Sequence, residues 1–155
     1  MLNIDQIKQY IDQSSPESRV YIGVDSERIM VKGVPYAVYT TAVVVHIDGN
    51  NGCKLFGGVD HERDYGPPDK PNNRLMNEAY KVSDLYLKLA EVVEDREVEV
   101  HLDLNPDDQH LSSAVIAQAV GYVRGVCNVI PKVKPVAFAA TAAADRYRSL
   151  KTANE

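Results

Sequence analysis

The sequence predicts an α/β fold in which helices pack on a mixed sheet. Three strand-like segments follow one another in the first part of the chain, and strands and helices then alternate. A hairpin-rich start followed by such alternation is typical of a sheet with parallel and antiparallel strands. We expect the order βββαβαβα after an extra N-terminal helix. The 155 residues are predicted to form one domain, with the extra helix in residues 1–15 and the core in residues 19–151.

The N-terminal half is predicted to hold one helix and three strands. Ile4, Ile7 and Ile11 fall on one helical stripe, and the segment 14–16 (Ser-Ser-Pro) ends that helix. Runs rich in Val, Tyr and Thr predict strands, at residues 19–25, 37–47 and 53–59. Residues 26–35 are predicted to be turn-like, and residues 48–52 to form a hairpin turn. Residues 60–73 are predicted to form a loop that contains prolines.

The C-terminal half is predicted to alternate helices and strands. A long helix is expected over residues 74–95, with Asn72 or Asn73 as its cap. A later helix is expected to start at Asp107 or Asp108 and to stop at Gly125, since glycine is a common helix terminator. The remaining elements are two strands and a last helix, expected at residues 97–104, 128–133 and 136–151.

Composition limits the function classes. The net charge of −5 argues against a protein that coats nucleic acid through bulk positive charge, although a few local phosphate contacts remain compatible with it. Cys53 and Cys127 match no metal or redox spacing, so we expect a reduced, cytoplasmic setting. Neither a signal peptide nor a membrane-spanning run is expected.

Four acidic residues are the candidate catalytic and metal-ligating groups. Asp25 and Asp103 each follow an apolar strand-like run, Glu78 interrupts the apolar stripe of the long helix, and Asp145 lies in the alanine-rich last helix. Burying a carboxylate is costly unless a cation or another partner compensates its charge. Mg²⁺ and Mn²⁺ take oxygen ligands, and two such ions can assist phosphodiester displacement. The pattern therefore predicts a two-metal site.

Each acid also has a structural explanation. Asp25 could start a turn, Glu78 could favour the dipole of the first helical turn, and Asp145 could pair with a neighbouring arginine. Asp103 could belong to a solvated strand face with Glu99 and His101, and we expect that histidine to be half-exposed. The four histidines lack zinc-site spacing, and no phosphate-binding glycine loop or nucleophile elbow is present.

Several segments resemble a known family, the YkuK-type ribonuclease H-like proteins of bacteria and phages, which have no assigned function. The similar segments are residues 21–26, 100–105, 121–123, 134–135, 139–140 and 144–146. The resemblance implies a five-stranded mixed sheet whose second strand is antiparallel to the others. It also implies that the four acids occupy the family's acidic positions. Val136 and Phe138 stand where an acid and a tryptophan are expected, which bears on substrate preference.

The sequence thus predicts a Mg²⁺- or Mn²⁺-dependent nuclease that acts on RNA, DNA or a hybrid. The alternatives are a nucleic-acid- or protein-binding module with a vestigial acid cluster, and a metal-dependent hydrolase of small substrates. Further residues are candidates for contacts with substrate or its phosphates: Ser26, Lys70, Arg74, His101, Asn105, Lys132, Lys134 and Arg146.

Overall fold

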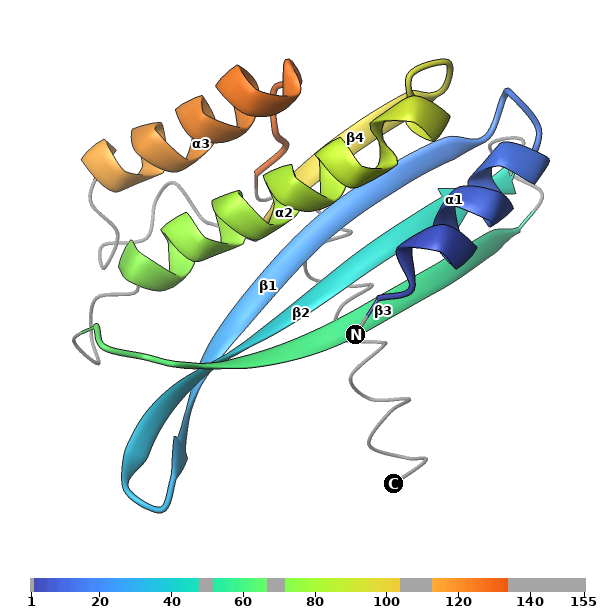
Figure 1. Cartoon of the computed structure of the whole chain (residues 1–155). Coiled ribbons are helices and arrows are strands. Elements are labelled where there is room, and N and C mark those ends of the chain that lie inside the picture. The colour runs from blue at the N-terminus through green and yellow to red at the C-terminus, as the bar shows by residue number, and fades with distance from the viewer. Residues whose placement is uncertain (1, 48–51, 67–71, 104–112, 134–155) are drawn as a thin grey trace.

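Three helices cover one face of a four-stranded sheet (Figure 1). The structure, a computed structural model, describes residues 2–47, 52–66, 72–103 and 113–133. The elements follow the order α1 (Ile4–Gln13), β1 (Arg19–Val31), β2 (Val34–His46), β3 (Cys53–Arg63), α2 (Asn72–Val93), β4 (Glu97–Leu102) and α3 (Ser113–Cys127). The predicted mixed α/β class and the extra N-terminal helix are confirmed.

The sheet has the order β3-β2-β1-β4. β2 pairs antiparallel with β1 and β3, whereas β1 and β4 are parallel, so β2 runs against the other three strands. The expected fifth strand at residues 128–133 contributes a single parallel bridge, between Lys132 and His101. Two backbone hydrogen bonds hold that bridge, from Leu102 N to Lys132 O (2.9 Å) and from Lys132 N to Val100 O (2.8 Å). The described residues therefore show four strands rather than five.

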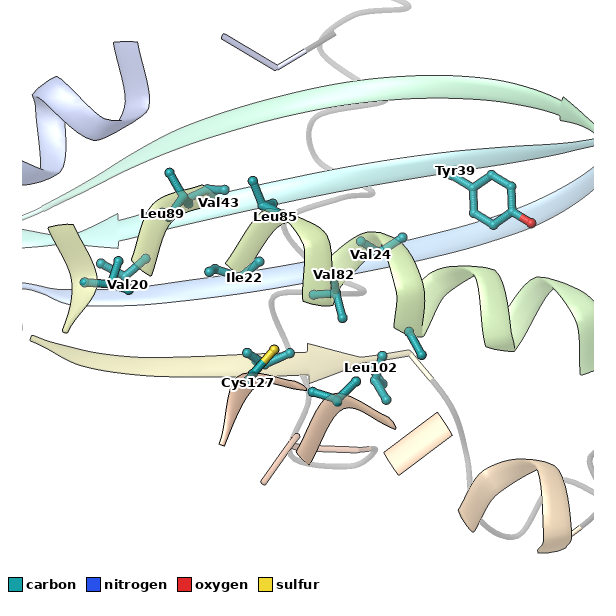
Figure 2. Close-up of a cluster of buried hydrophobic side chains, with 14 of the residues drawn as sticks. Val20, Ile22, Val24, Tyr39, Val43, Val82, Leu85, Leu89, Leu102 and Cys127 are labelled. Atoms are coloured by element: carbon teal, nitrogen blue, oxygen red, sulfur yellow. The ribbon is translucent and has the colours of Figure 1, made fainter. Parts of the chain in front are cut away.

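The hydrophobic core lies between α2 and the sheet. Figure 2 shows aliphatic side chains of β1 and α2 facing one another, with Cys127 of α3 at the margin. Alternate residues of β1 are buried against α2, because successive side chains on a strand point to opposite faces; they are Val20, Ile22 and Val24. Tyr21 instead packs with Val44 in a second cluster on the other face. The alternation fixes which strand residues can approach α2.

The β1–β2 hairpin is longer than the sequence predicted. Residues 26–35 were expected to be turn-like, but β1 continues to Val31 and β2 begins at Val34. Only Lys32 and Gly33 form the turn, with φ of 50° and 77°. Positive φ at both central residues is the requirement of a type I′ turn, which matches the twist of paired strands. The prediction was wrong because Lys-Gly is a weaker turn signal than Asn-Gly.

Other boundaries also shift. β3 extends to Arg63, because its residues beyond position 59 continue to pair with β2, so the first part of the predicted 60–73 loop is strand. α2 begins at Asn72, so both predicted cap residues lie inside the helix. α3 passes through Gly125 and ends at Cys127, after which Asn128 has a φ of 56°. Burial of Cys127 in the core extends α3 beyond the glycine.

The predicted last helix at residues 136–151 lies outside the described residues, as does the expected start of the helix before residue 113. Among the helices that the structure describes, none combines the length and the apolar character needed to cross a membrane.

Candidate functional site

Two predicted aspartates directly follow the last residue pair of the parallel strands β1 and β4. Val24 of β1 pairs with Leu102 of β4 in parallel register. The next residues on the two strands are Asp25 and Asp103, so the register places them side by side. Both aspartates are half-buried. The sequence placed Asp25 at the end of its strand, but β1 continues beyond it to Val31, whereas Asp103 does follow the end of β4.

Glu78 approaches the same end of the sheet from α2. Its side chain is only 5% exposed, and it shares the buried stripe of α2 with Leu75 and Val82. Ser26 Oγ donates a hydrogen bond of 2.7 Å to Glu78 Oε2. The other carboxylate oxygen, Oε1, is buried and has no hydrogen-bond partner among the residues that the structure describes. The prediction that Glu78 faces the core is therefore confirmed.

The electrostatic environment of Glu78 links it to both aspartates. Burial raises the pKa of the Glu78 carboxyl well above its usual value, while the Ser26 hydrogen bond opposes that rise. The negative charges of Asp25 and Asp103 raise the pKa of Glu78 further, and the charge of Arg74 lowers it. The three acids therefore interact electrostatically, and Glu78 holds its proton to a higher pH than an ordinary glutamate.

The strand pleat assigns the acids to different faces of the sheet. Ser26 continues the face that packs on α2, where it contacts Glu78. Alternation therefore directs Asp25, and Asp103 beside it, toward the opposite face. The charges of both aspartates nevertheless act on Glu78, so side-chain alternation does not separate the three acids electrostatically. The predicted convergence of all three carboxylates within a few ångströms stays a prediction.

The donor set suits a hard cation. In the part of the chain that the structure describes, which does not include Asp145, no three His, Cys, Asp or Glu side chains are placed to hold one metal ion together. The unpaired Oε1 of Glu78 is nevertheless the kind of buried oxygen that requires compensation. Carboxylate oxygens are preferred ligands of Mg²⁺ and Mn²⁺. The chemistry of these carboxylates suits such an ion, although the described acids are not placed to hold one together.

A comparison with protein families supports the sequence resemblance. The family model described as "Ribonuclease H-like" matches residues 3–149, which is nearly the whole chain. The chain belongs to the ribonuclease H-like family. No curated protein matches it.

His101 of this ribonuclease H-like protein is buried, not half-exposed as the sequence predicted. Its Nε2 lies 3.0 Å from Glu99 Oε2, and its ring packs edge-on against Tyr21 with ring centroids 5.8 Å apart. Burial lowers the pKa of His101, and the Glu99 contact opposes that shift. The prediction failed because burial increases along β4, from exposed Glu97 to the buried histidine.

The remaining predicted residues have mixed outcomes. Arg74 is half-buried one helical turn before Glu78, and within the described part of the chain its Nε has no hydrogen-bond partner. Lys132 is exposed beside His101, whose pKa its charge lowers. The other candidates fall outside the described residues, so their roles stay predictions: Lys70, Asn105, Lys134, Asp145 and Arg146.

The sequence missed the role of one polar residue of the site and the presence of another. Ser26 was a candidate for substrate contact, but its hydroxyl binds Glu78. Thr40 pairs in register with Asp25, and its buried Oγ1 finds no hydrogen-bond partner in the described ranges of the chain. The strand pairing that brings Thr40 beside Asp25 depends on the exact hairpin register, which sequence patterns specify only weakly.

Proposed function

We propose that this protein is a divalent-metal-dependent nuclease that hydrolyses phosphodiester bonds with Mg²⁺ or Mn²⁺. The observation that carries the proposal is the buried Glu78, with one unpaired oxygen, at the end of the sheet where Asp25 and Asp103 lie side by side. A fold of this family accommodates many activities, so the acids rather than the fold support the proposal.

Each acid has a proposed role. Asp25 and Asp103 would be the shared or primary metal ligands. Glu78 would hold one ion, and Asp145 would hold the other. Two such ions, when bound, stabilise the attacking and leaving oxygens of a phosphodiester displacement.

The neighbouring residues would prepare the site for the cation. Glu78 must lose its proton before it can act as a ligand. The hydrogen bond from Ser26 favours the ionised form of Glu78, and so does the positive charge of Arg74. Ser26 also fixes the rotation of the carboxylate, so that Oε2 is occupied and Oε1 remains for a ligand.

The test is cleavage by Asp25→Asn and Asp103→Asn variants. Both are expected to abolish the cleavage of labelled RNA, DNA and hybrid substrates in Mg²⁺ or Mn²⁺, while the circular dichroism spectrum stays that of the wild type. Asp84→Asn is the matched control. Asp84 is exposed on α2 and pairs with Lys88 at 2.9 Å, so its loss should leave cleavage unchanged. Equal cleavage by the wild type and the site variants would mean that the activity arises elsewhere.

The same panel separates the alternatives. A binding module on this fold would bind nucleic acid or protein without cleaving nucleic acid and would show no response to metal. A small-substrate hydrolase would act on mononucleotides or other phosphate esters but not on polynucleotides.

A further inference from the structure

A pocket of about 300 Å³ opens beside the candidate site, between the first turns of α2 and the ends of β2 and β3. Ligand pockets are commonly about 300–1,000 Å³, so this one has room for part of a small molecule or a single unit of a polymer. The residues that matter for recognition are two arginines, three tyrosines and an asparagine: Arg63, Arg74, Tyr39, Tyr65, Tyr80 and Asn77.

Positive charge in this pocket is not neutralised by ion pairs. Within the described residues, neither Arg63 nor Arg74 forms a salt bridge, and the one pocket aspartate, Asp64, is paired with Arg28 at 3.3 Å. The two arginines therefore offer groups that can contact an anion, although the carboxylates of Glu62, Asp64 and Glu78 also act on Tyr39 in this pocket.

A second pocket of similar volume offers a contrast. It lies between the N-terminus of α1, α2 and β3, and its two lysines are already paired with carboxylates. Lys81 contacts Glu62 at 2.9 Å, and Lys88 contacts Asp84 at 2.9 Å. Paired lysines leave no comparable attraction for an anionic ligand.

Exposed aromatic rings border the arginine-containing pocket. Tyr65 is 83% exposed and Tyr80 is 45% exposed. Arg63 lies over the Tyr65 ring, with its guanidinium carbon 5.5 Å from the ring centroid. Tyr80 is held edge-on by Tyr122 of α3, with centroids 4.8 Å apart. Exposed rings whose orientation is set by neighbours are suited to stacking with another planar group.

The pocket is connected directly to the candidate site. Tyr39, which lies at one end of the row of core side chains in Figure 2, pairs in register with Ser26, the partner of Glu78. Asn77 precedes Glu78 on α2, and its Nδ2 donates to Tyr39 Oη at 2.9 Å. Burial raises the pKa of Tyr39, so its hydroxyl stays protonated. The hydroxyl oxygen accepts the bond from Asn77, so this bond does not use the hydroxyl proton.

We propose that this pocket binds an unpaired nucleotide of a single-stranded nucleic acid, with the base stacked on Tyr65 and the adjoining phosphates contacted by Arg63 and Arg74. The inference rests on the proposed function, because it names the substrate of the same site. It goes beyond that function by selecting a single-stranded segment over a continuous duplex.

The chemistry explains the preference for a single strand. A base within a duplex has both of its faces covered by neighbouring base pairs, whereas an unpaired base can place one face on an aromatic ring. Every base has such a face, so the stacking is tolerant of sequence. Arginines beside the rings contact the backbone phosphates, which adds affinity that depends on salt.

The experiment measures binding without catalysis. A fluorescently labelled single-stranded oligonucleotide, as DNA and as RNA, is titrated with the full chain in EDTA, and anisotropy reports the Kd. Tyr65→Ala is expected to weaken binding about tenfold, a value within the range for loss of one stacked base. Tyr65→Phe should bind like the wild type, because it keeps the ring. Leu87→Ala is the matched control, since Leu87 is 54% exposed two turns beyond Tyr80 on α2 but does not line the pocket.

The arginines are tested through salt dependence. Arg63→Gln and Arg74→Gln are each expected to reduce the slope of log K against log salt concentration by about 0.7, the value for one phosphate contact to a single strand. Lys54→Gln, at an exposed lysine of β3 outside the pocket, should leave the slope unchanged.

The outcomes separate this inference from the proposed function. Duplex binding as tight as single-strand binding, or equal losses in Tyr65→Ala and Leu87→Ala, would overturn the inference even if the protein cleaves nucleic acid with metal. Ring-dependent binding of single strands in a protein that never cleaves would support the pocket and reject the nuclease.

Discussion

Glu78 is the residue at which local sequence and packing conflict most clearly. An ionisable carboxyl occupies a core position of α2, where only one of its oxygens is hydrogen-bonded. Natural sequences usually avoid such a conflict unless a functional site requires it. The charges of Asp25 and Asp103 increase the cost of ionising Glu78. The site therefore destabilises the metal-free fold.

The first prediction concerns the Glu78→Gln variant in EDTA. The folded-state pKa of Glu78 lies above its unfolded value, so the folded protein holds the proton more tightly. As pH rises from the ordinary glutamate pKa of about 4.3 through the raised folded value, the wild type progressively loses stability. The glutamine variant has no proton to lose there. It should melt at a higher temperature than the wild type at neutral pH, and the difference should shrink as pH falls toward 4.

Differential scanning fluorimetry across that pH range makes the measurement. Glu91→Gln is a control on the same helix, because Glu91 is exposed and pairs with Lys8. The hydrogen bond from Lys8 is the main cause that lowers the pKa of Glu91. The Glu91→Gln substitution should therefore change the melting temperature at neutral pH in the opposite direction to Glu78→Gln. A wild type more stable than Glu78→Gln at neutral pH would contradict the assignment of Glu78 as a buried, uncompensated acid.

At the residue scale, the sequence predicted the individual acids better than their surroundings. Glu78 was recognisable because helical periodicity alone places it on the apolar stripe. Its partner Ser26 was not, because contact between positions 52 residues apart depends on how α2 crosses β1. Tyr65 and Arg63 gave no sequence signal either, since exposed tyrosines and arginines are ordinary on protein surfaces.

At the scale of elements, the β1–β2 hairpin has the most demanding backbone. Its turn requires positive φ at Lys32 and Gly33, and only glycine adopts that conformation without steric cost. A Cβ added at Gly33 would meet no other atom within 4 Å, so the cost of a substitution there is conformational rather than steric crowding.

The second prediction compares two glycine-to-alanine variants. Gly33→Ala should lower the free energy of unfolding by about 1–2 kcal/mol, the cost of a left-handed conformation for a residue with a Cβ. Gly121→Ala, at an exposed position inside α3 that is equally open, should instead raise it by about 0.5–1 kcal/mol, because alanine favours a helix interior. Urea unfolding followed by circular dichroism gives both values. Changes of the same sign in the two variants would contradict the assigned backbone conformations.

Element types were predictable where periodicity was strong, and boundaries were not. The stripe of α1 and the β-rich run of β2 identified those elements directly. The extension of β1 to Val31 depends on cross-strand pairing with β2, which no local propensity encodes. The segment around Lys132 has strand-like composition, but it joins β4 through one bridge only. The strand boundaries and the strand that were mispredicted therefore depend on tertiary pairing rather than on local sequence.

At the scale of the whole molecule, the fold brings acidic and basic side chains to one region of the sheet. Asp25 and Asp103 lie where the pairing of β1 with β4 stops, and the arginine-containing pocket lies beside them at the start of α2. A cation would offset the mutual repulsion of the acids, while the arginines and exposed tyrosines would attract a polyanion. Metal binding should therefore be coupled to the stability of the entire domain.

The last prediction is a metal-dependent melting shift that falls with pH. A ligand that binds only the folded state adds about 2.7 kcal/mol when its concentration is one hundred times Kd. For a domain of this size, that corresponds to roughly 5–11 °C in melting temperature. Millimolar Mn²⁺ should give a shift of this order at neutral pH. Protons compete with metal for the same oxygens, and the raised pKa of Glu78 places that competition above the ordinary glutamate range, so the shift should be smaller at pH 5.

The double variant Asp25→Asn, Asp103→Asn identifies the site that produces the shift. Removing both strand-end carboxylates should eliminate the Mn²⁺ effect, whereas Asp84→Asn should retain it, because Asp84 is paired with Lys88 on the exposed side of α2. The pH dependence should disappear together with the shift, since both arise from the same oxygens. A Mn²⁺ shift that persists in the double variant would locate the metal away from Asp25 and Asp103, and the nuclease proposal would lose its main support.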